Sequence, residues 1–254
     1  MKLQKISYSG MSTYKSCPKK YYYSYIRQMW PERKALALVL GSAIHKVLAT
    51  QYEQLRDGKV LKEEEAMEVL LKALKSEPID IDETKQTIDT IALDSKHIVQ
   101  KICNNPLKIK PKNVERFFVV DFKNPLTGEI LGPKLSGVID LDTVDNEIIE
   151  HKSSGKLWTD VDIKNTLQHV VYHVGYYNLH KTLPKKIYYH VIYKQNKSGI
   201  DLFEVNISDI DVMNFFNVAR SVINNIEKEI WNPTPSQFGC RFCDYSKVCL
   251  ESRI

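Results

Sequence analysis

The spacing of apolar and polar positions divides the chain into a helical first half and a mixed second half. Apolar residues of the first half recur about every 3.6 positions, which is typical of amphipathic helices. This spacing predicts helices at 35–55, 62–75 and 84–103, with 76–83 as a loop between the last two. The third helix is predicted to bury Ile88, Ile91, Ile98 and Ile102.

The second half alternates between short apolar strands and helical segments. Runs of β-branched and aromatic residues predict a strand at 114–122, a hairpin at 135–154 and strands at 186–194 and 199–207, joined by a turn at 195–198. Helices are predicted at 162–183 and from the cap Ser208 to about Ile230. Strands with helices before, among and after them predict an α/β fold with a mixed central sheet flanked by helices.

The hairpin LSGVIDLDTVDNEIIEHKSS carries ionisable groups inside apolar strands. Asp140 lies in the first strand, and Glu150 and Lys152 lie two residues apart in the second, so their side chains leave the same face. Charges in strands this apolar need a reason. A solvated hairpin at the surface is the alternative to a functional site.

The loop of the hairpin decides whether the two carboxylates meet. A two-residue loop would pair Asp140 with His151 on opposite faces, whereas a three-residue loop at 144–146 pairs Asp140 with Glu150. The second register suits Asn146, which tolerates the left-handed conformation that such a loop requires. The carboxylates would then stand about 5 Å apart at Cβ. A divalent cation such as Mg²⁺ or Mn²⁺ would relieve their repulsion, and Lys152 would orient or help deprotonate a bound water, which predicts a metal-dependent hydrolase.

Composition limits the class of protein but does not indicate an activity. The 254 residues suffice for one large domain or two small ones, and 43% apolar and 26% charged residues are ordinary for a soluble protein. A net charge of +5 is compatible with a polyanionic partner. Because no apolar run approaches the ~20 residues of a membrane span and the first residues lack a signal-peptide core, we expect a cytoplasmic protein without a membrane segment.

Two segments of the first half also carry candidate chemistry. Lysines and tyrosines mix at 8–25, where Pro18 suits a first helical turn and places Cys17 at a helix start. This mixture either contacts phosphates and bases or packs as an amphipathic helix. His45 lies on the apolar face of its predicted helix, one turn after Gly41, and is either a ligand of a metal or phosphodiester or a hydrogen-bonded core histidine.

The C-terminal tail contains a C-x2-C-x5-C cluster, Cys240, Cys243 and Cys249. A tetrahedral metal or a [4Fe-4S] cluster needs four ligands. Cys17, at a helix start, is the better candidate for the fourth than Cys103, which lies in an apolar stripe. The spacing does not separate zinc from iron–sulfur.

Taken in order, these motifs resemble the RecB-type branch of the PD-(D/E)XK nucleases, and above all its iron–sulfur members such as CRISPR-associated exonucleases and the nuclease domain of AddB. The motifs are Cys17-Pro18, Gly41-x3-His45, Gly137-Val-Ile-Asp140, Glu150-His-Lys152, Gln168-x3-Tyr172 and C-x2-C-x5-C. The resemblance covers roughly residues 9–249. It implies a restriction-endonuclease-like core and a single nuclease domain over 1–254, with 1–34 and 231–254 as an iron–sulfur clamp, 35–110 as a helical segment and 111–230 as the nuclease core.

The resemblance also implies roles for single residues. Mn²⁺ or Mg²⁺ would be bound by His45, Asp140, Glu150 and the main-chain carbonyl of His151. Lys152 would position the attacking water. Gln168 and Tyr172 would support the site and the DNA strand, which completes a catalytic set of Asp140, Glu150, Lys152, Gln168 and Tyr172. The [4Fe-4S] cluster would be held by Cys17, Cys240, Cys243 and Cys249.

The resulting prediction is a metal-dependent DNA exonuclease that acts on single-stranded DNA or DNA ends. Repair, recombination and CRISPR adaptation would all use this chemistry, with proteins of those processes as possible partners. No G-x4-G-K-[ST] phosphate loop occurs in the sequence, so we expect a free-standing nuclease without a helicase motor. The alternative is a catalytically inactive nucleic-acid-binding module whose metal cluster is structural.

Overall fold

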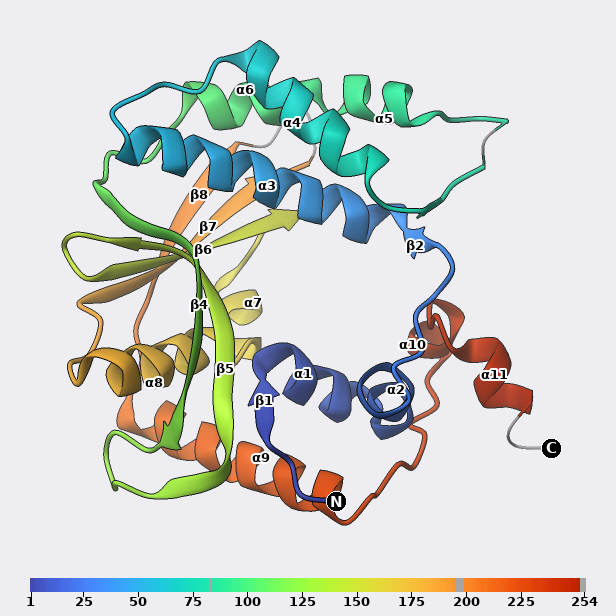
Figure 1. Ribbon diagram of the computed structural model, residues 1–254, viewed down its shortest axis with the longest axis vertical. Coiled ribbons are helices and arrows are strands. Elements are labelled where there is room, and N and C mark those ends of the chain that lie inside the picture. Colours follow the sequence, from blue (N-terminus) through green and yellow to red (C-terminus); the bar gives the residue numbers. More distant parts are fainter. Residues whose placement is uncertain (83, 195–198, 252–254) are drawn as a thin grey trace.

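The protein is built on a mixed β-sheet with helices on both faces (Figure 1). The computed structural model describes residues 1–82, 84–194 and 199–251, so the turn predicted at 195–198 lies outside the described residues. The sheet consists of β1 (Lys5–Ser7), β4 (Pro111–Lys123), β5 (Ile130–Thr143), β6 (Glu147–Ser154), β7 (Lys186–Tyr193) and β8 (Ile200–Val205). This arrangement confirms the predicted α/β fold with a mixed central sheet.

The long strand β5 organises the sheet. One of its edges pairs with antiparallel β4 along most of its length. The other edge pairs with parallel β1 at 134–136 and with antiparallel β6 at 141–142. Within the described chain no strand pairs with that edge at 137–140, the stretch that contains Asp140. From there β6 continues alongside parallel β7, which in turn pairs with antiparallel β8.

The β5–β6 hairpin has the predicted three-residue register. Leu141 pairs with Ile149 and Asp142 with Ile148, and the same register places Asp140 opposite Glu150. Asn146 ends the loop in the left-handed region with φ 61°, and its amide N–H donates to the carbonyl of Thr143 at 3.1 Å. The three-residue loop therefore fixes the register that places the two carboxylates opposite each other.

One face of the sheet is covered by helices of the first half of the chain, α3 (Leu36–Arg56), α4 (Glu63–Lys75), α5 (Ile88–Asp94) and α6 (Lys96–Asn104) (Figure 1). The single helix predicted at 84–103 is wrong, because the chain starts its helix only after the cap Thr87 and breaks again at Ser95. The hydroxyl of Ser95 donates to the carbonyl of Ile91 at 2.8 Å, a local bond that competes with helix continuation. The predicted stripe packs as expected: Ile91, Ile98 and Ile102 are buried and Ile88 is half-buried.

Two short strands accompany this helical layer, one before α3 and one between α4 and α5. β2 (Lys34–Ala35) pairs with β3 (Ile79–Asp80), so the stretch 76–83 predicted as a loop contains a strand. No helix of the described residues is long and apolar enough to cross a bilayer.

The other face of the sheet is covered by α1 (Tyr8–Ser16), α8 (Gln168–His180) and α9 (Asp209–Glu227), the last capped by Ser208 as predicted. The helix predicted at 162–183 is instead split into α7 (Asp160–Asn165) and α8, because Thr166 is extended. The Thr166 hydroxyl accepts from the Gln168 amide N–H at 3.3 Å and binds the Tyr8 hydroxyl at 2.9 Å. Gln168 therefore starts α8.

The N-terminal segment and the C-terminal tail lie side by side. α1, α2 (Pro18–Tyr21) and the π-turn η1 (Tyr22–Ile26) adjoin α10 (Gln237–Arg241) and α11 (Ser246–Glu251) in Figure 1. The Tyr14 hydroxyl donates to the carbonyl of Ile230 at 2.7 Å, and the Tyr21 ring stacks on Trp231 with centroids 6.0 Å apart. Tyr14 and Tyr21 are buried, so these two rings pack in the interior, as expected for an amphipathic helix, and do not face a nucleic acid.

Candidate active site

Asp140 lies where β5 and β6 separate. Its side chain is nearly buried, with the residue 8% exposed. Oδ2 accepts from the main-chain N–H of His151 at 2.8 Å, so the carboxylate occupies the place of the next ladder bond. Burial raises the pKa of Asp140 well above its ordinary value, and the nearby charge of Glu150 raises it further. A cation at this point would stabilise the ionised form of both groups.

Glu150 is held by three side-chain donors. Its Oε1 accepts from Lys152 Nζ at 2.6 Å and from Gln168 Nε2 at 2.7 Å, and its Oε2 accepts from the Tyr172 hydroxyl at 2.6 Å. The Lys152 ammonium also donates to Gln168 Oε1 at 2.6 Å. Burial and the charge of Glu150 raise the pKa of Tyr172 well above its ordinary value, so the phenol remains a donor. The structure thus brings the predicted residues Glu150, Lys152, Gln168 and Tyr172 into one network.

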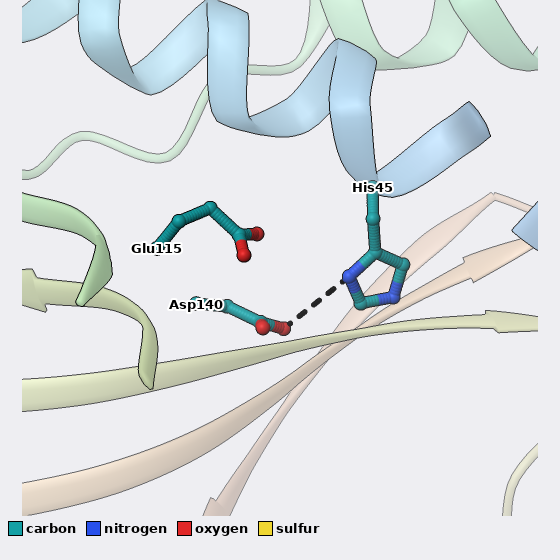
Figure 2. A group of neighbouring side chains, drawn as sticks. All are labelled: His45, Glu115 and Asp140. Carbon is teal, nitrogen blue, oxygen red and sulfur yellow. Dashed lines mark ion pairs between the residues drawn. The ribbon is translucent and has the colours of Figure 1, made fainter. Parts of the chain in front are cut away.

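His45 reaches the same place from helix α3 (Figure 2). Its Nδ1 lies 3.5 Å from Asp140 Oδ2. A Cβ on Gly41, one turn earlier, would stand 3.3 Å from the Ser153 hydroxyl, so a glycine here lets α3 approach β6 closely. Burial lowers the pKa of His45 and favours the neutral imidazole, which is the form that binds a metal.

Glu115 is a site residue that sequence reasoning missed. It lies on β4 between Val114, which pairs with Leu141, and Arg116, which pairs with Ile139, and so faces Asp140. Its φ is 51°, which is uncommon for a residue other than glycine. Figure 2 shows its carboxylate beside Asp140 and His45. The sequence shows only a charged residue near the start of an apolar strand. That it faces Asp140 follows from the register of β4 with β5.

His151 contributes its main chain to the site and its ring to the core. The ring stacks on Tyr52 of α3 with centroids 5.2 Å apart, and its Nδ1 lies 2.9 Å from His190 Nδ1. Burial lowers the pKa of His151 well below its ordinary value. Because the ring is fixed beneath α3, the main chain of residue 151 is held beside Asp140.

The family model of the PD-(D/E)XK nuclease superfamily matches residues 5–250. The chain belongs to the PD-(D/E)XK nuclease superfamily. A crystal structure of the Eubacterium rectale protein named "putative exonuclease" resembles it with a TM-score of 0.62 and 14% identity, over 99% of this chain and 89% of that chain. The structure of SSO0001 is 14% identical over 95% of this chain and 97% of that chain, with a TM-score of 0.40. A search of the curated proteins found no match.

At this identity the structural likeness shows the fold alone, and the mixed sheet flanked by helices is consistent with the restriction-endonuclease-like core of the superfamily. Superfamily membership confirms the predicted resemblance at that level, and the superfamily is one of nucleases, whose substrates are nucleic acids. The closer likeness to RecB-type and iron–sulfur members stays a prediction.

PD-(D/E)XK nucleases generally use divalent metal ions, and this site offers suitable donors. One ligand atom each of His45, Glu115 and Asp140 lies within 4.8 Å of the others. Two carboxylates and an imidazole suit Mn²⁺ and accept Mg²⁺. Among the described residues this set does not include Glu150, whose oxygens instead accept from Lys152, Gln168 and Tyr172. The predicted ligands His45 and Asp140 are thus together, with Glu115 beside them.

The four cysteines predicted to form a metal cluster line one cavity of about 510 Å³ between α2 and the tail of this nuclease: Cys17, Cys240, Cys243 and Cys249. Cys103 instead packs on α6 against the helical core, as predicted. A tetrahedral zinc ion would hold its sulfurs about 3.8 Å apart. In the described chain no three cysteine sulfurs gather within 4.8 Å of one another. The four cysteines therefore face a common space but are spread more widely than a zinc site.

Proposed function

We propose that this nuclease is a metal-dependent deoxyribonuclease that works as an exonuclease on single-stranded DNA or DNA ends. The observation that carries the proposal is the network around Glu150. A buried acidic pair, Asp140 and Glu150, stands beside a lysine held at 2.6 Å from both Glu150 and Gln168. An ammonium fixed next to two carboxylates is the arrangement expected for hydrolysis of a phosphodiester.

Five groups would hold the cation: the side chains of His45, Glu115, Asp140 and Glu150 and the main-chain carbonyl of His151. Mn²⁺ or Mg²⁺, when bound, would supply a Lewis acid for the phosphate and lower the pKa of a bound water. If a cation replaced Gln168 at Glu150, Gln168 would stay anchored, because its other N–H donates to the Tyr172 hydroxyl at 2.7 Å.

The other side chains of the network would orient the attacking water and the Glu150 carboxylate. Lys152 would position the attacking water, because its Nζ is fixed by Glu150 and Gln168. Tyr172 and Gln168 would keep the Glu150 carboxylate turned toward Asp140. The alternative of an inactive binding module loses support from this geometry, since a module without catalysis has no use for a lysine held so tightly between acceptors.

We also propose that Cys17, Cys240, Cys243 and Cys249 hold a [4Fe-4S] cluster. Their common cavity supports a shared metal centre, and the resemblance to iron–sulfur members is the reason for choosing [4Fe-4S]. Residues 1–34 and 231–254 would then form the clamp of a single nuclease domain, with 35–110 as its helical segment and 111–230 as its core. The N–H of Thr234, which donates to Cys17 Sγ at 3.5 Å, already joins the two parts of the clamp.

The biological setting that fits this activity is DNA repair, recombination or CRISPR adaptation, with DNA and proteins of those processes as partners. The test is digestion of linear single-stranded, linear double-stranded and circular DNA with Mn²⁺, with Mg²⁺ and with EDTA. We expect linear DNA to be degraded from its ends, circular DNA to survive, and EDTA to abolish degradation. Equal cutting of circles would make the enzyme an endonuclease, and cleavage in EDTA would exclude the metal.

A further inference from the structure

An apolar strip runs along β4 and β5 directly beside the candidate site. It consists of Phe117, Val119 and Val138, which are 62%, 47% and 37% exposed. Phe117 pairs with Val138 across the two strands, two residues beyond the position where Glu115 faces Asp140. Phe117 and Val138 each stand two residues along the strand from Glu115 and Asp140, so the strip begins about 6.6 Å from the two carboxylates.

The strip is not part of the folding core. The residues between its members point to the other side of the sheet, where Phe118 and Ile139 are buried against the α8 and α9 layer. Phe117 stands outside this core with most of its ring in solvent. A large exposed apolar group beside a polar site indicates an interaction surface more strongly than scattered exposed residues do.

Lysines lie at both ends of the strip. Lys46 of α3, the residue after His45, is exposed at the end near the candidate site. At the far end Lys134 forms an ion pair with Asp121 and stands beside the exposed Lys5 of β1 in the sheet register. An apolar surface between cationic groups matches a chain of bases with phosphates on either side.

We propose that Phe117, supported by Val138, is a platform on which an unpaired nucleobase of the DNA substrate stacks next to the scissile phosphate. The proposal rests on the proposed function and deepens it. Two residues of a strand span about 6.6 Å, so the stacked base belongs to a nucleotide at or adjoining the cleaved bond. In a duplex both faces of each base are covered by neighbouring bases. The platform therefore selects single strands or frayed ends, without preference for sequence.

The test compares Phe117→Ala with wild type on a single-stranded oligonucleotide and on the same strand with an abasic site at the nucleotide next to the cleaved bond. Loss of one base–aromatic contact is expected to raise KM roughly 5- to 150-fold with little change in kcat. The abasic site should impair wild type in the same way and should not impair Phe117→Ala further. Leu202→Ala, which removes an exposed apolar group from β8 at the other edge of the sheet, should behave as wild type.

A second measurement separates this proposal from the nuclease assignment. A strand with 2-aminopurine at the same nucleotide, bound in EDTA, should be quenched by wild type and not by Phe117→Leu, which keeps the apolar volume but has no ring. Equal quenching by both proteins, or a wild type indifferent to the abasic site, overturns the platform. Quenching without any cleavage in Mn²⁺ would leave the platform standing and overturn the proposed nuclease function.

Discussion

At the scale of single residues, the orientation of Glu150 is the feature on which the candidate site depends. Each of its oxygens is occupied by a fixed donor, Lys152 and Gln168 at Oε1 and Tyr172 at Oε2. A buried carboxylate that loses one such donor keeps its desolvation but not its orientation. Removing a donor should therefore affect the rate of cleavage and also the stability of the fold.

Tyr172→Phe should reduce the cleavage rate about tenfold, with a loss of about 1–3 kcal/mol in the free energy of unfolding, because Glu150 loses the hydroxyl that fixes Oε2. Initial rates with Mn²⁺ and urea denaturation measure the two effects. Tyr176→Phe, on the next turn of α8, loses a 2.9 Å bond to Asn146 away from the site and is the matched control. Full activity of Tyr172→Phe would remove the assigned role of this hydroxyl.

The pH dependence of stability tests a buried histidine beside the network. Burial lowers the pKa of His169 to about 4, and its Nδ1 lies 3.2 Å from the Tyr189 hydroxyl. Between that pKa and the ordinary value of about 6.5 the unfolded chain binds more protons than the folded chain. The stabilisation is complete above pH ~6.5 and is lost as the pH falls toward 4.

His169→Gln keeps a polar group at this position but cannot titrate. The urea midpoint of wild type should fall more steeply than that of the variant between pH 6.5 and 4.5. Parallel curves for the two proteins would show that His169 does not carry this effect.

Most of the candidate site could be predicted from residues close together in sequence. Asp140, Glu150 and Lys152 follow from one hairpin, and the step from Gln168 to Tyr172 is one helical turn. Glu115 could not, because its position depends on the pairing of β4 with β5 and on a left-handed residue inside a strand. Neither the pairing nor the left-handed conformation can be recognised from the spacing of apolar residues.

At the scale of elements, local chemistry was enough for the hairpin but not for helix ends. Asn146 supplies the left-handed residue that the three-residue loop needs, so the loop sequence alone determines the register of β5 and β6. The break before α8 depends on Thr166, whose hydroxyl contacts Tyr8 from the other end of the chain. A contact over that sequence distance could not be predicted from periodicity.

Helix α8, which carries Gln168 and Tyr172, is positioned by a close contact with the sheet. The Phe118 ring of β4 fits between Gly137 of β5 and Gly175 of α8, where added Cβ atoms would stand 2.8 and 2.6 Å from it. Such distances cannot be accommodated without movement. The two glycines thus set how near α8 lies to the strands of the candidate site.

Gly175→Ala should destabilise the fold by about 1–3 kcal/mol through overpacking, less the ~1 kcal/mol that alanine gains in a helix. It should also slow cleavage, because α8 and its two site residues are displaced. Adding Phe118→Leu should recover part of both losses. Gly132→Ala on β5, where a Cβ meets nothing within 4 Å, is the control. A Gly175→Ala protein as stable and active as wild type would contradict this account of α8.

At the scale of the whole molecule, the two ends of the chain are brought to one place. The hydroxyl of Tyr245 donates to the carbonyl of Met29 at 2.7 Å and accepts from Ser24 Oγ at 3.0 Å. The sequence predicted this closure from cysteine chemistry alone. The aromatic and hydrogen-bonded contacts that accompany it could not be predicted, because they join segments with no local relation.

Cys17→Ala tests the proposed cluster as a clamp. Wild type should be brown with broad visible absorbance if it holds [4Fe-4S] and colourless if it holds zinc, which has a filled d shell. The variant should lose the colour and lower the melting temperature by several degrees, because a link across the whole chain is lost. Cys103→Ala should do neither. Loss of colour in Cys103→Ala with its retention in Cys17→Ala would contradict the ligand set.

The Mn²⁺-dependent cleavage rate of Lys152→Ala on linear single-stranded DNA, measured beside its DNA affinity, decides whether Lys152 acts in catalysis. Because Lys152 is fixed between Glu150 and Gln168, its loss is expected to lower the rate at least ~100-fold while leaving DNA binding and fold nearly intact. Lys156→Ala removes only an exposed ion pair with Asp162 and should cleave as wild type does. A Lys152→Ala protein that digests DNA at the wild-type rate would contradict the proposed catalytic site.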